Sequence, residues 1–318
     1  MDTHDKEQIL ARMADTLRSD QLKKLRYVLE TLDAENSISN DILLQRFLDA
    51  KKVEGCAAST IEYYRSTLQR MLDNIKRQLD SITADDLRAY INSYVEENKV
   101  SKVTADNVRR ILSSFFSWLE NEDYIIKSPV RKIHRIKTPT LIKETFSDEQ
   151  LEALRDQCEN IRDLAIIDLL ASTGMRIGEL TNLNRSDINF EERECVVLGK
   201  GNKERTVYFD ARTKRHLIQY LQSRKDDEEA LFCHLNGKGK RLSKGAIEMR
   251  IKRLGTGIQI ARAYPHKFRR TVATVAIYKG MPIEQVQKLL GHARIDTTMH
   301  YAQVNQNNVK LSHRKYLA

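Results

Sequence analysis

The chain has 318 residues, of which 41% are hydrophobic and 31% are charged, and its formal net charge is +10. This composition is typical of a water-soluble globular protein with two domains and a short appendage. No apolar run reaches the ~18 residues that a membrane span needs. The mixed-charge N-terminus also lacks the apolar core of a signal peptide, so we expect a cytoplasmic protein.

The four cysteines lie far apart and form no CxxC pair. A zinc site or a disulfide framework usually shows closer and more regular cysteine spacing. The cysteine pattern therefore predicts neither, and it fits a reducing compartment.

The positive charge is unevenly distributed. Residues 1–39 contain eight acidic and six basic side chains, so the rest of the chain carries a net +12. Residues 127–143 alone contain six Lys or Arg residues and no carboxylate. A concentrated basic stripe in a basic chain indicates a polyanionic partner, most often nucleic acid. On charge alone, a solvated linker remains an equal alternative.

Residues 1–39 form a short extension with a predicted helix over 6–33. Leu22, Leu25 and Leu29 follow the three- and four-residue spacing of a helix face. The extension is too short to be a domain, and we treat it as a possible protein–protein contact.

Residues 40–126 are predicted to be a small all-helical domain. Helices are expected over residues 59–72, 81–95 and 107–122, each with one apolar face. Thr83 and Asp86 form a capping signature for the second of them. Phe115 and Phe116 lie at core spacing, which favours packing over base stacking. The basic side chains off the apolar faces are available to DNA phosphates.

Residues 127–144 are predicted to be a basic, extended interdomain linker. They contain Pro129 and Pro139, two of the four prolines in the chain. Proline disfavours continued helix and stiffens a connection. Such a linker suits a protein that closes around a DNA duplex.

Residues 145–318 are predicted to be a second domain with a C-terminal tail. Residues 147–157 begin with a capping signature, and residues 161–173 form an almost wholly apolar, buried helix. Residues 194–210 contain two β-rich runs joined by Gly-Lys-Gly-Asn, which predicts a hairpin. The expected fold is therefore mainly α with a small antiparallel β-sheet.

Several residues of the second domain could carry chemistry. Arg176 follows the buried helix that Gly174 ends. Lys200 lies in the hairpin turn, which lacks the GK-[ST] ending of a Walker loop. His266 and Arg269 lie one turn apart at a helix start, and helix N-termini favour anions. Taken alone, each of these residues is more often a surface or capping residue.

The stretch "LLGHARIDTTMHY" adds His292, in a turn after Gly291, and Tyr301 nine residues later. A tyrosine so near the end of a chain is usually a packing residue. Arginine forks stabilise the charge on the nonbridging oxygens of a transferring phosphoryl group. A tyrosine with a pKa near ~10 needs a cationic surround or a base to act as a nucleophile. The combined set predicts a covalent phosphotyrosine route through a phosphodiester, with lysine protonating the leaving oxygen.

Four motifs carry a family resemblance: "TGMRIGEL", "GKGNKER", "PHKFRRTVAT" and "LLGHARIDTTMHYAQV". In this order and spacing they resemble the catalytic domain of tyrosine site-specific recombinases of the λ-integrase and Xer-like family. Residues 40–126 resemble the helical core-binding domain of that family, and the likeness spans roughly residues 40–318.

The resemblance implies a role for each candidate residue. Arg176 and Arg269 would grip the scissile phosphate, and Lys200 would protonate the leaving 5′ oxygen. His266 would hydrogen-bond or accept a proton, and His292 would contact the phosphate. Tyr301 would be the nucleophile that forms a 3′-phosphotyrosyl link.

Two positions depart from the family pattern. Phe268 stands where leucine is common, a change of core volume that leaves the chemistry alone. Arg270 stands where many members have a histidine, and we expect it either to support its neighbours or to face DNA. The candidate DNA phosphate contacts are Arg65, Arg109, Arg110, Lys132, Arg135 and Arg270.

The resemblance also implies the partners. The substrate would be double-stranded DNA with short inverted-repeat core sites, with no cofactor or metal. The protein would be a monomer when free and a homotetramer in the synaptic complex. The tail, residues 305–318, would dock on a neighbouring protomer and regulate which tyrosines are active.

Several functions remain open at this point. The appended N-terminus and Arg270 favour integration and excision of a mobile element, or inversion of a DNA segment, over Xer-like resolution of chromosome dimers. A type IB-like topoisomerase uses similar chemistry in a monomer. A DNA-binding regulator that has lost catalysis would bind DNA without forming covalent adducts.

Overall fold

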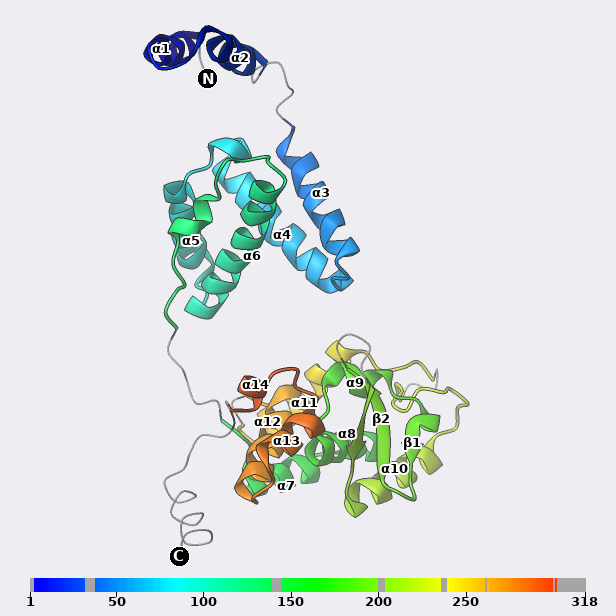
Figure 1. Cartoon of the computed structure of the whole chain (residues 1–318). Helices are drawn as coiled ribbons and strands as arrows, with labels where there is room; N and C mark the ends of the chain where they lie inside the picture. Colours follow the sequence, from blue (N-terminus) through cyan, green and yellow to red (C-terminus); the bar gives the residue numbers. More distant parts are fainter. Residues whose placement is uncertain are drawn as a thin grey trace, which may run out of the picture. The chain divides into compact units, whose positions relative to one another are not determined.

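The computed structural model describes residues 3–31, 38–138, 144–199, 204–235, 239–260, 262–299 and 301. The chain divides into two compact units, residues 1–141 and 142–318. Helices dominate both units, and the second also contains a three-stranded antiparallel sheet (Figure 1). The expected fold class is therefore confirmed. Within the described ranges, no helix combines the length and apolar character that crossing a membrane requires.

The N-terminal segment forms two helices where one was predicted. α1 (Thr3–Met13) and α2 (Ser19–Thr31) contact each other across a turn. The turn contains Asp15 and Thr16, whose short polar side chains compete with helical backbone hydrogen bonds. The prediction of helix was right and the prediction of continuity was wrong.

The rest of the first unit is a bundle of four helices. They are α3 (Asn40–Val53), α4 (Ala58–Ile75), α5 (Ala84–Asn98) and α6 (Lys102–Asn121), with 3-10 turns η1 (Leu79–Ser81) and η2 (Pro129–Lys132). Thr83 and Asp86 form the predicted capping box at the start of α5. Phe115 and Phe116 are fully buried, and the Phe115 ring lies 5.1 Å from the Phe47 ring. These aromatic rings therefore pack in the core, as their spacing predicted.

Residues 128–136, which follow α6, pack against the four-helix bundle of the first unit and do not form an extended linker. Val130 is buried, and Ile133 and Ile136 contact the core of the bundle. The backbone N–H of Ile136 donates to the carboxylate of Asp106 at 3.1 Å. The prediction of an extended linker was wrong here because it was based on the prolines and the charges. It left out the apolar residues at every third position, which are Val130, Ile133 and Ile136.

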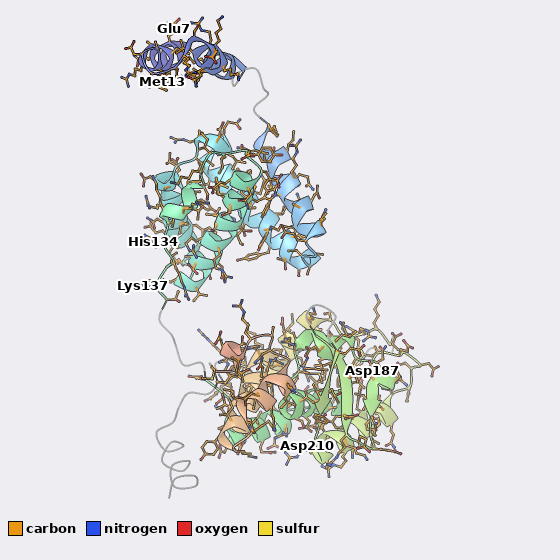
Figure 2. The ribbon with its side chains drawn as sticks, viewed as in Figure 1. Glu7, Met13, His134, Lys137, Asp187 and Asp210 are labelled. Carbon is orange, nitrogen blue, oxygen red and sulfur yellow. The ribbon has the colours of Figure 1, made fainter. Side chains whose placement is uncertain are left out.

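This packing places the basic side chains of the segment on the outside of the first unit. His134 and Lys137 are both exposed (Figure 2). The Arg88 guanidinium donates to the Lys132 carbonyl at 2.9 Å and so fixes the backbone of the segment. The remaining part of the predicted linker, residues 139–143, lies outside the described residues.

The second unit combines helices with a small sheet that has one buried and one exposed face. Its elements are α7 (Asp148–Asp156), α8 (Ile161–Thr173), α9 (Ile177–Asn182), η3 (Arg185–Asp187), β1 (Ile188–Asn189), β2 (Glu194–Leu198), β3 (Glu204–Tyr208), α10 (Ala211–Ser223), α11 (Lys244–Gly257), α12 (Pro265–Tyr278), α13 (Ile283–Leu290) and α14 (Ile295–Met299). The strand order is β1-β2-β3, and the predicted hairpin is β2–β3, with Val196 opposite Thr206. β1 has two residues, too few to give a periodic signal.

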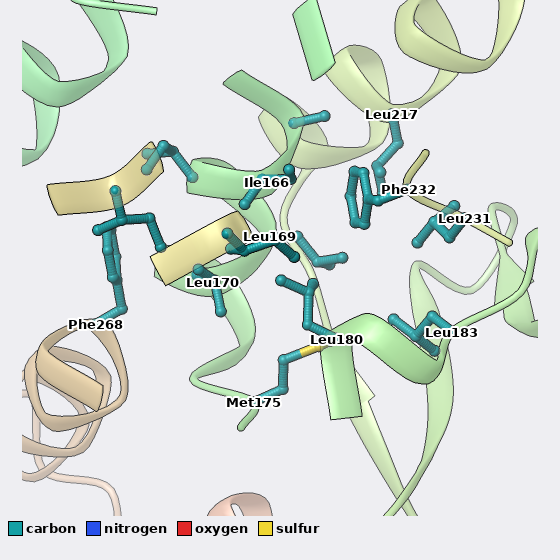
Figure 3. Close-up of a cluster of buried hydrophobic side chains, with 14 of the residues drawn as sticks. Ile166, Leu169, Leu170, Met175, Leu180, Leu183, Leu217, Leu231, Phe232 and Phe268 are labelled. Carbon is teal, nitrogen blue, oxygen red and sulfur yellow. The ribbon is translucent and has the colours of Figure 1, made fainter. Parts of the chain in front are cut away.

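Helix α8 lies at the centre of this unit and positions the candidate site. It contacts α10 and α12, and α12 in turn contacts α13. Figure 3 shows Leu170 of α8 and Phe268 of α12 in the buried cluster. α8 ends at Gly174 in the left-handed conformation, with φ of 61°, as predicted. A Cβ at this position would lie 3.2 Å from Leu290 and from Val272, so α13 and α12 both lie close to the end of α8.

Candidate active site

Three arginines from distant parts of the chain donate hydrogen bonds to the end of α13. α13 ends at Gly291, which has a φ of 64°, and the last carbonyls of a helix have no partner within it. Arg205 Nε donates to the Leu289 carbonyl at 3.1 Å, Arg269 Nη2 donates to the Leu290 carbonyl, and Arg176 Nη2 donates to the Gly291 carbonyl at 2.8 Å. Because a helix C-terminus carries partial negative charge, this end attracts all three guanidinium groups.

Arg269 is the most deeply buried of the three. Its side chain is 1% exposed, and its Nη1 also donates to the Gly174 carbonyl at 2.9 Å. Burial, together with the cations of Arg176 and Arg205, lowers the pKa of Arg269 to about 9. The guanidinium is therefore charged at neutral pH, but its burial and the neighbouring cations destabilise that charge. A bound anion such as a phosphate would relieve this cost.

Glu179 is the carboxylate of this cluster. It is buried, and its oxygens accept from the backbone N–H and Nη1 of Arg176, both at 2.7 Å. They also accept from Nη1 and Nη2 of Arg205, at 2.6 and 2.7 Å. Burial by itself raises the pKa of Glu179, but the hydrogen bonds from Arg205 and Arg176 outweigh it and hold the pKa below its usual value. Three cations thus face one carboxylate, which leaves a net positive site.

Glu179 and Arg205 were not among the residues predicted from the sequence, although each lies inside one of the four motifs. Glu179 follows Arg176 by three residues, the spacing of a capping box, and this signal was available. Arg205 ends the "GKGNKER" motif, where an arginine on a strand is usually a surface residue. Nothing in the local pattern connects it to α9 or α13.

His292 follows Gly291 and lies beside the tyrosine. The His292 and Tyr301 ring centroids are 5.9 Å apart with an interplanar angle of 29°. His292 Nδ1 lies 2.8 Å from the hydroxyl oxygen of the buried Thr298. Burial, followed by the charges of Arg269 and Arg176, lowers the pKa of His292 to about 4. The imidazole is therefore neutral at pH 7.

Tyr301 combines a packed ring with an accessible hydroxyl. It lies in a turn beyond α14, where its backbone N–H donates to the Thr298 carbonyl at 2.9 Å. Its ring packs against the buried cluster of Ala273, Val286 and Leu290. Its Oη lies 3.4 Å from Nε2 of His266, an exposed residue in the first turn of α12. Tyr301 can therefore be both a packing residue and a nucleophile, because its ring is packed while its hydroxyl lies near His266.

The structure brings five of the six predicted catalytic residues together. They are Arg176, His266, Arg269, His292 and Tyr301. The sixth, Lys200, lies outside the described residues, in the connection between β2 and β3.

The candidate DNA contacts of the first unit differ in how available they are. Arg110, Lys132 and Arg135 are exposed. Arg65 donates to the Gln45 side chain at 3.0 Å. The Arg109 side chain is 15% exposed and pairs with Asp106 at 2.8 Å.

A polar groove on the first unit runs between α3 and α6. Its lining includes Lys51, Arg109, Arg110, Ser113 and Trp118. Glu54 also lines the groove and pairs with Lys51 at 2.7 Å, and Arg109 pairs with Asp106, so these two cations are partly neutralised. Contact of Arg109 and Arg110 with DNA stays a prediction.

Arg270 has a role inside the second unit. It is 5% exposed, and it donates to the Glu144 carbonyl at 3.0 Å and to the Tyr264 hydroxyl at 2.6 Å. Of the two expectations for this residue, the geometry favours support of its neighbours, because the guanidinium is engaged within the fold. It ties the start of the second unit to α12, beside Arg269.

The chain matches two family descriptions. Residues 144–308 match the phage integrase family, and residues 43–126 match the phage integrase N-terminal SAM-like domain. Tyrosine recombinase XerC of Staphylococcus aureus (strain JH9) is 30% identical over 279 residues, which cover 84% of this chain and 93% of the relative. Tyrosine recombinase XerC of Corynebacterium glutamicum is 31% identical over 266 residues, covering 81% and 85%.

Solved structures share the fold. A λ integrase dimer bound to a COC′ core site matches with a TM-score of 0.71 and 19% identity, over 86% of this chain and 80% of that one. XerH recombinase bound to a palindromic difH substrate matches with a TM-score of 0.69 and 21% identity, over 96% and 93%. On the family match and the curated relatives, the chain belongs to the phage integrase family and is a tyrosine recombinase.

Proposed function

We propose that this protein is a site-specific recombinase that cleaves and rejoins DNA through a 3′-phosphotyrosyl intermediate, with Tyr301 as the nucleophile. The observation that carries the proposal is the convergence of three guanidinium groups at the end of α13, beside Tyr301. Such a site favours a phosphodiester, because arginine forks stabilise the charge of the transferring phosphoryl group.

Cleavage would proceed by one transesterification. Tyr301 Oη attacks the scissile phosphorus as the bond from phosphorus to the 5′ oxygen breaks. The tyrosine proton passes to His266, whose Nε2 lies 3.4 Å from Tyr301 Oη, and Lys200 gives a proton to the leaving 5′ oxygen. Rejoining runs in reverse with the 5′ hydroxyl of a partner strand. The number of phosphodiester bonds is conserved, so the reaction needs no ATP, and the arginines would supply the positive charge that a metal supplies in other phosphoryl transfers.

Two arginines and a neutral histidine would hold the phosphate. Arg176 and Arg269 would stabilise its nonbridging oxygens. If the Thr298 hydroxyl donates to His292 Nδ1, the ring proton lies on Nε2, from which His292 would donate to a phosphate oxygen. The neutral state of His292 supports this assignment, since one donor then remains without adding another cation.

The DNA partner is expected to be a duplex with short inverted repeats. We propose that the basic residues of the first unit and of residues 127–137 contact its phosphates. Arg270, being engaged within the fold, is a supporting residue in this proposal. λ integrase is described as a dimer bound to a COC′ core site in one solved structure and as a tetramer bound to a Holliday junction in another. By the same logic this chain would act as a homotetramer assembled on DNA from monomers.

The tail, residues 305–318, lies outside the described residues, and its docking on a neighbouring protomer stays a prediction. Deletion of these residues should impair synapsis while leaving binding to a single site largely intact. Unchanged recombination by the truncated protein would contradict this.

The biological task has two candidates. Residues 1–39 precede the region that matches the family, and such an extension favours a mobile-element integrase or an invertible switch. The XerC relatives, matched over most of their length, favour resolution of chromosome dimers. In either case the protein would work in the bacterial cytoplasm, where the DNA is.

Covalent capture in cells tests the proposal and separates the tasks. Wild type and Tyr301→Phe would be expressed, adducts trapped under denaturing conditions, and the attached DNA sequenced. The proposal predicts adducts at paired, inverted core sequences that are lost in the variant. A single chromosomal site would indicate dimer resolution, whereas sites at the ends of a mobile element or on both sides of an invertible segment would indicate the other task.

Two outcomes would overturn the proposal. Adducts scattered over the DNA, with relaxation of supercoils and no joined product between two sites, would indicate a type IB-like topoisomerase. DNA binding by the wild type without any adduct would indicate a regulator that has lost catalysis.

A further inference from the structure

We propose that Arg205 is a positioning residue for DNA cleavage: through Glu179 it holds Arg176 in the orientation that grips the scissile phosphate. This inference rests on the function proposed above. Arg205 lies on β3, its side chain is 11% exposed, and it is none of the six residues that the sequence motifs suggested.

Arg205 determines where the Glu179 carboxylate lies. Its Nη1 and Nη2 donate to the two different oxygens of Glu179, at 2.6 and 2.7 Å, which is the parallel bidentate geometry of a guanidinium with a carboxylate. The oxygen that accepts from Arg205 Nη1 is also the one that accepts from Arg176 Nη1 at 2.7 Å. A shift of this carboxylate therefore shifts Arg176.

Arg205 also touches the second contact that holds Arg176. The Arg176 Nη2 donates to the Gly291 carbonyl, and Arg205 packs against that same residue. A Cβ built on Gly291 would lie 2.8 Å from Arg205 Cδ and 3.1 Å from its Nε. Its Nε donates to the Leu289 carbonyl, two residues earlier. Both anchors of Arg176 thus rest on Arg205.

The charge of Arg205 matters as much as its shape. Glu179 is buried and carries a negative charge beside Arg176. With Arg205 removed, this carboxylate would be free to pair with both Nη atoms of Arg176 and to neutralise it. With Arg205 present, two hydrogen bonds hold the Arg176 guanidinium, which has five N–H groups. The remaining N–H groups can reach a phosphate, and the Arg176 side chain is 34% exposed.

The test compares three variants on an oligonucleotide that carries the core site found by covalent capture. Arg205→Met removes the charge and the donors, and Arg205→Lys keeps only the charge. Arg155→Met is the matched control, because Arg155 is similarly buried, at 14% exposure, and pairs with the buried Asp168 at 2.6 Å in a network of α7 and α8. The dissociation constant for DNA, the single-turnover rate of adduct formation at saturating DNA and the melting temperature are measured for each.

Arg205→Met is expected to slow adduct formation by about 100-fold, the scale of a misplaced catalytic group, while DNA affinity changes by less than about threefold. Arg205→Lys should recover part of the rate. Arg155→Met should lower the melting temperature and leave the rate near that of the wild type. Arg205→Met cleaving as fast as Arg155→Met would overturn the inference, whereas a wild type that forms no adduct would overturn the proposed function instead.

Two modified substrates identify the group through which Arg205 acts. A methylphosphonate at the scissile position removes the negative charge of the phosphate and lessens the need for Arg176, so the defect of Arg205→Met should shrink at least about tenfold. A 5′-bridging phosphorothiolate provides a leaving group that needs no proton, which would bypass Lys200. Full rescue of Arg205→Met by the phosphorothiolate would overturn the inference, since Arg205 would then act on the leaving group.

Discussion

Arg110 of α6 and Arg269, which contacts the end of α13, are the same residue type in opposite environments. Arg110 is exposed, and Arg109 pairs with Asp106 one helical turn away. Arg269 is buried and donates to carbonyls of residues 174 and 290, far from it in sequence. An exposed cation adds attraction for a polyanion that salt screens. A buried cation fixed by rigid backbone can instead act on one phosphate at one geometry.

Arg269→Lys should give the largest effect of this comparison. Lysine keeps the charge, but its single nitrogen lacks the planar fork through which Arg269 reaches two carbonyls and a phosphate from separate nitrogens. Adduct formation at saturating DNA should fall by on the order of 10³-fold or more, the scale of an arginine that stabilises phosphoryl transfer. Arg110→Lys is the control and should keep the wild-type rate. Cleavage by Arg269→Lys within a factor of ten of the wild type would show that the fork is not needed.

Gly291→Ala should give the next largest effect. The left-handed backbone costs about 1–2 kcal/mol for a residue with a Cβ, and here the Cβ would also strike Arg205. Gly280→Ala is the matched control, because Gly280 has a φ of 90° and nothing within 4 Å of a built Cβ. Both variants should melt at lower temperature, but Gly291→Ala alone should cleave about tenfold or more slowly. Equal cleavage rates would mean that the contact with Arg205 is irrelevant.

The low pKa of His292 predicts a pH dependence of stability. The folded state binds the proton only near pH 4, whereas an unfolded histidine binds it near pH ~6.5. Below the unfolded pKa the unfolded state holds more protons, so stability falls as pH decreases from about 6.5 to 4, by about 1–3 kcal/mol. Urea unfolding across this range measures the slope. His292→Gln should flatten it, and an unchanged slope would assign the effect to other groups.

The smallest effects are expected in the first unit. Arg110→Ala should weaken DNA binding and reduce the slope of log affinity against log salt by about 1, with no change in melting temperature. Arg109→Ala should also lower the melting temperature, because Asp106 would lose one of the groups that hold it beside Ile136. Salt-dependence titrations and thermal melts of the two variants check this. A loss of stability in Arg110→Ala would contradict its assignment as a free surface cation.

Local signals in the sequence sufficed for much of the architecture. The capping box of Thr83 and Asp86, the end of α8 at Gly174 and the end of α13 at Gly291 are each specified by residues within one turn. The hairpin also followed from its own turn residues. These features depend on residues that are close together in the sequence, so a local sequence pattern predicts them.

The rest of the site depends on contacts between distant segments. Arg205 reaches Glu179 across 26 residues and Leu289 across 84, and no periodicity encodes such a meeting. The packing of residues 128–136 is an intermediate case: its apolar residues at every third position were a local signal, but its partners Asp106 and Arg88 lie on other helices. The motifs located the catalytic residues, but the groups that hold them became visible only in the fold.

Tyr301 is expected to become bonded to DNA at a site built around the buried Arg269. The most direct measurement is mass spectrometry of the nuclease-trimmed peptide from a trapped adduct of the purified wild-type protein. We expect a nucleotide attached through phosphate to Tyr301, and no adduct in Tyr301→Phe. A phosphate on any other residue, or an adduct that persists in Tyr301→Phe, would contradict it.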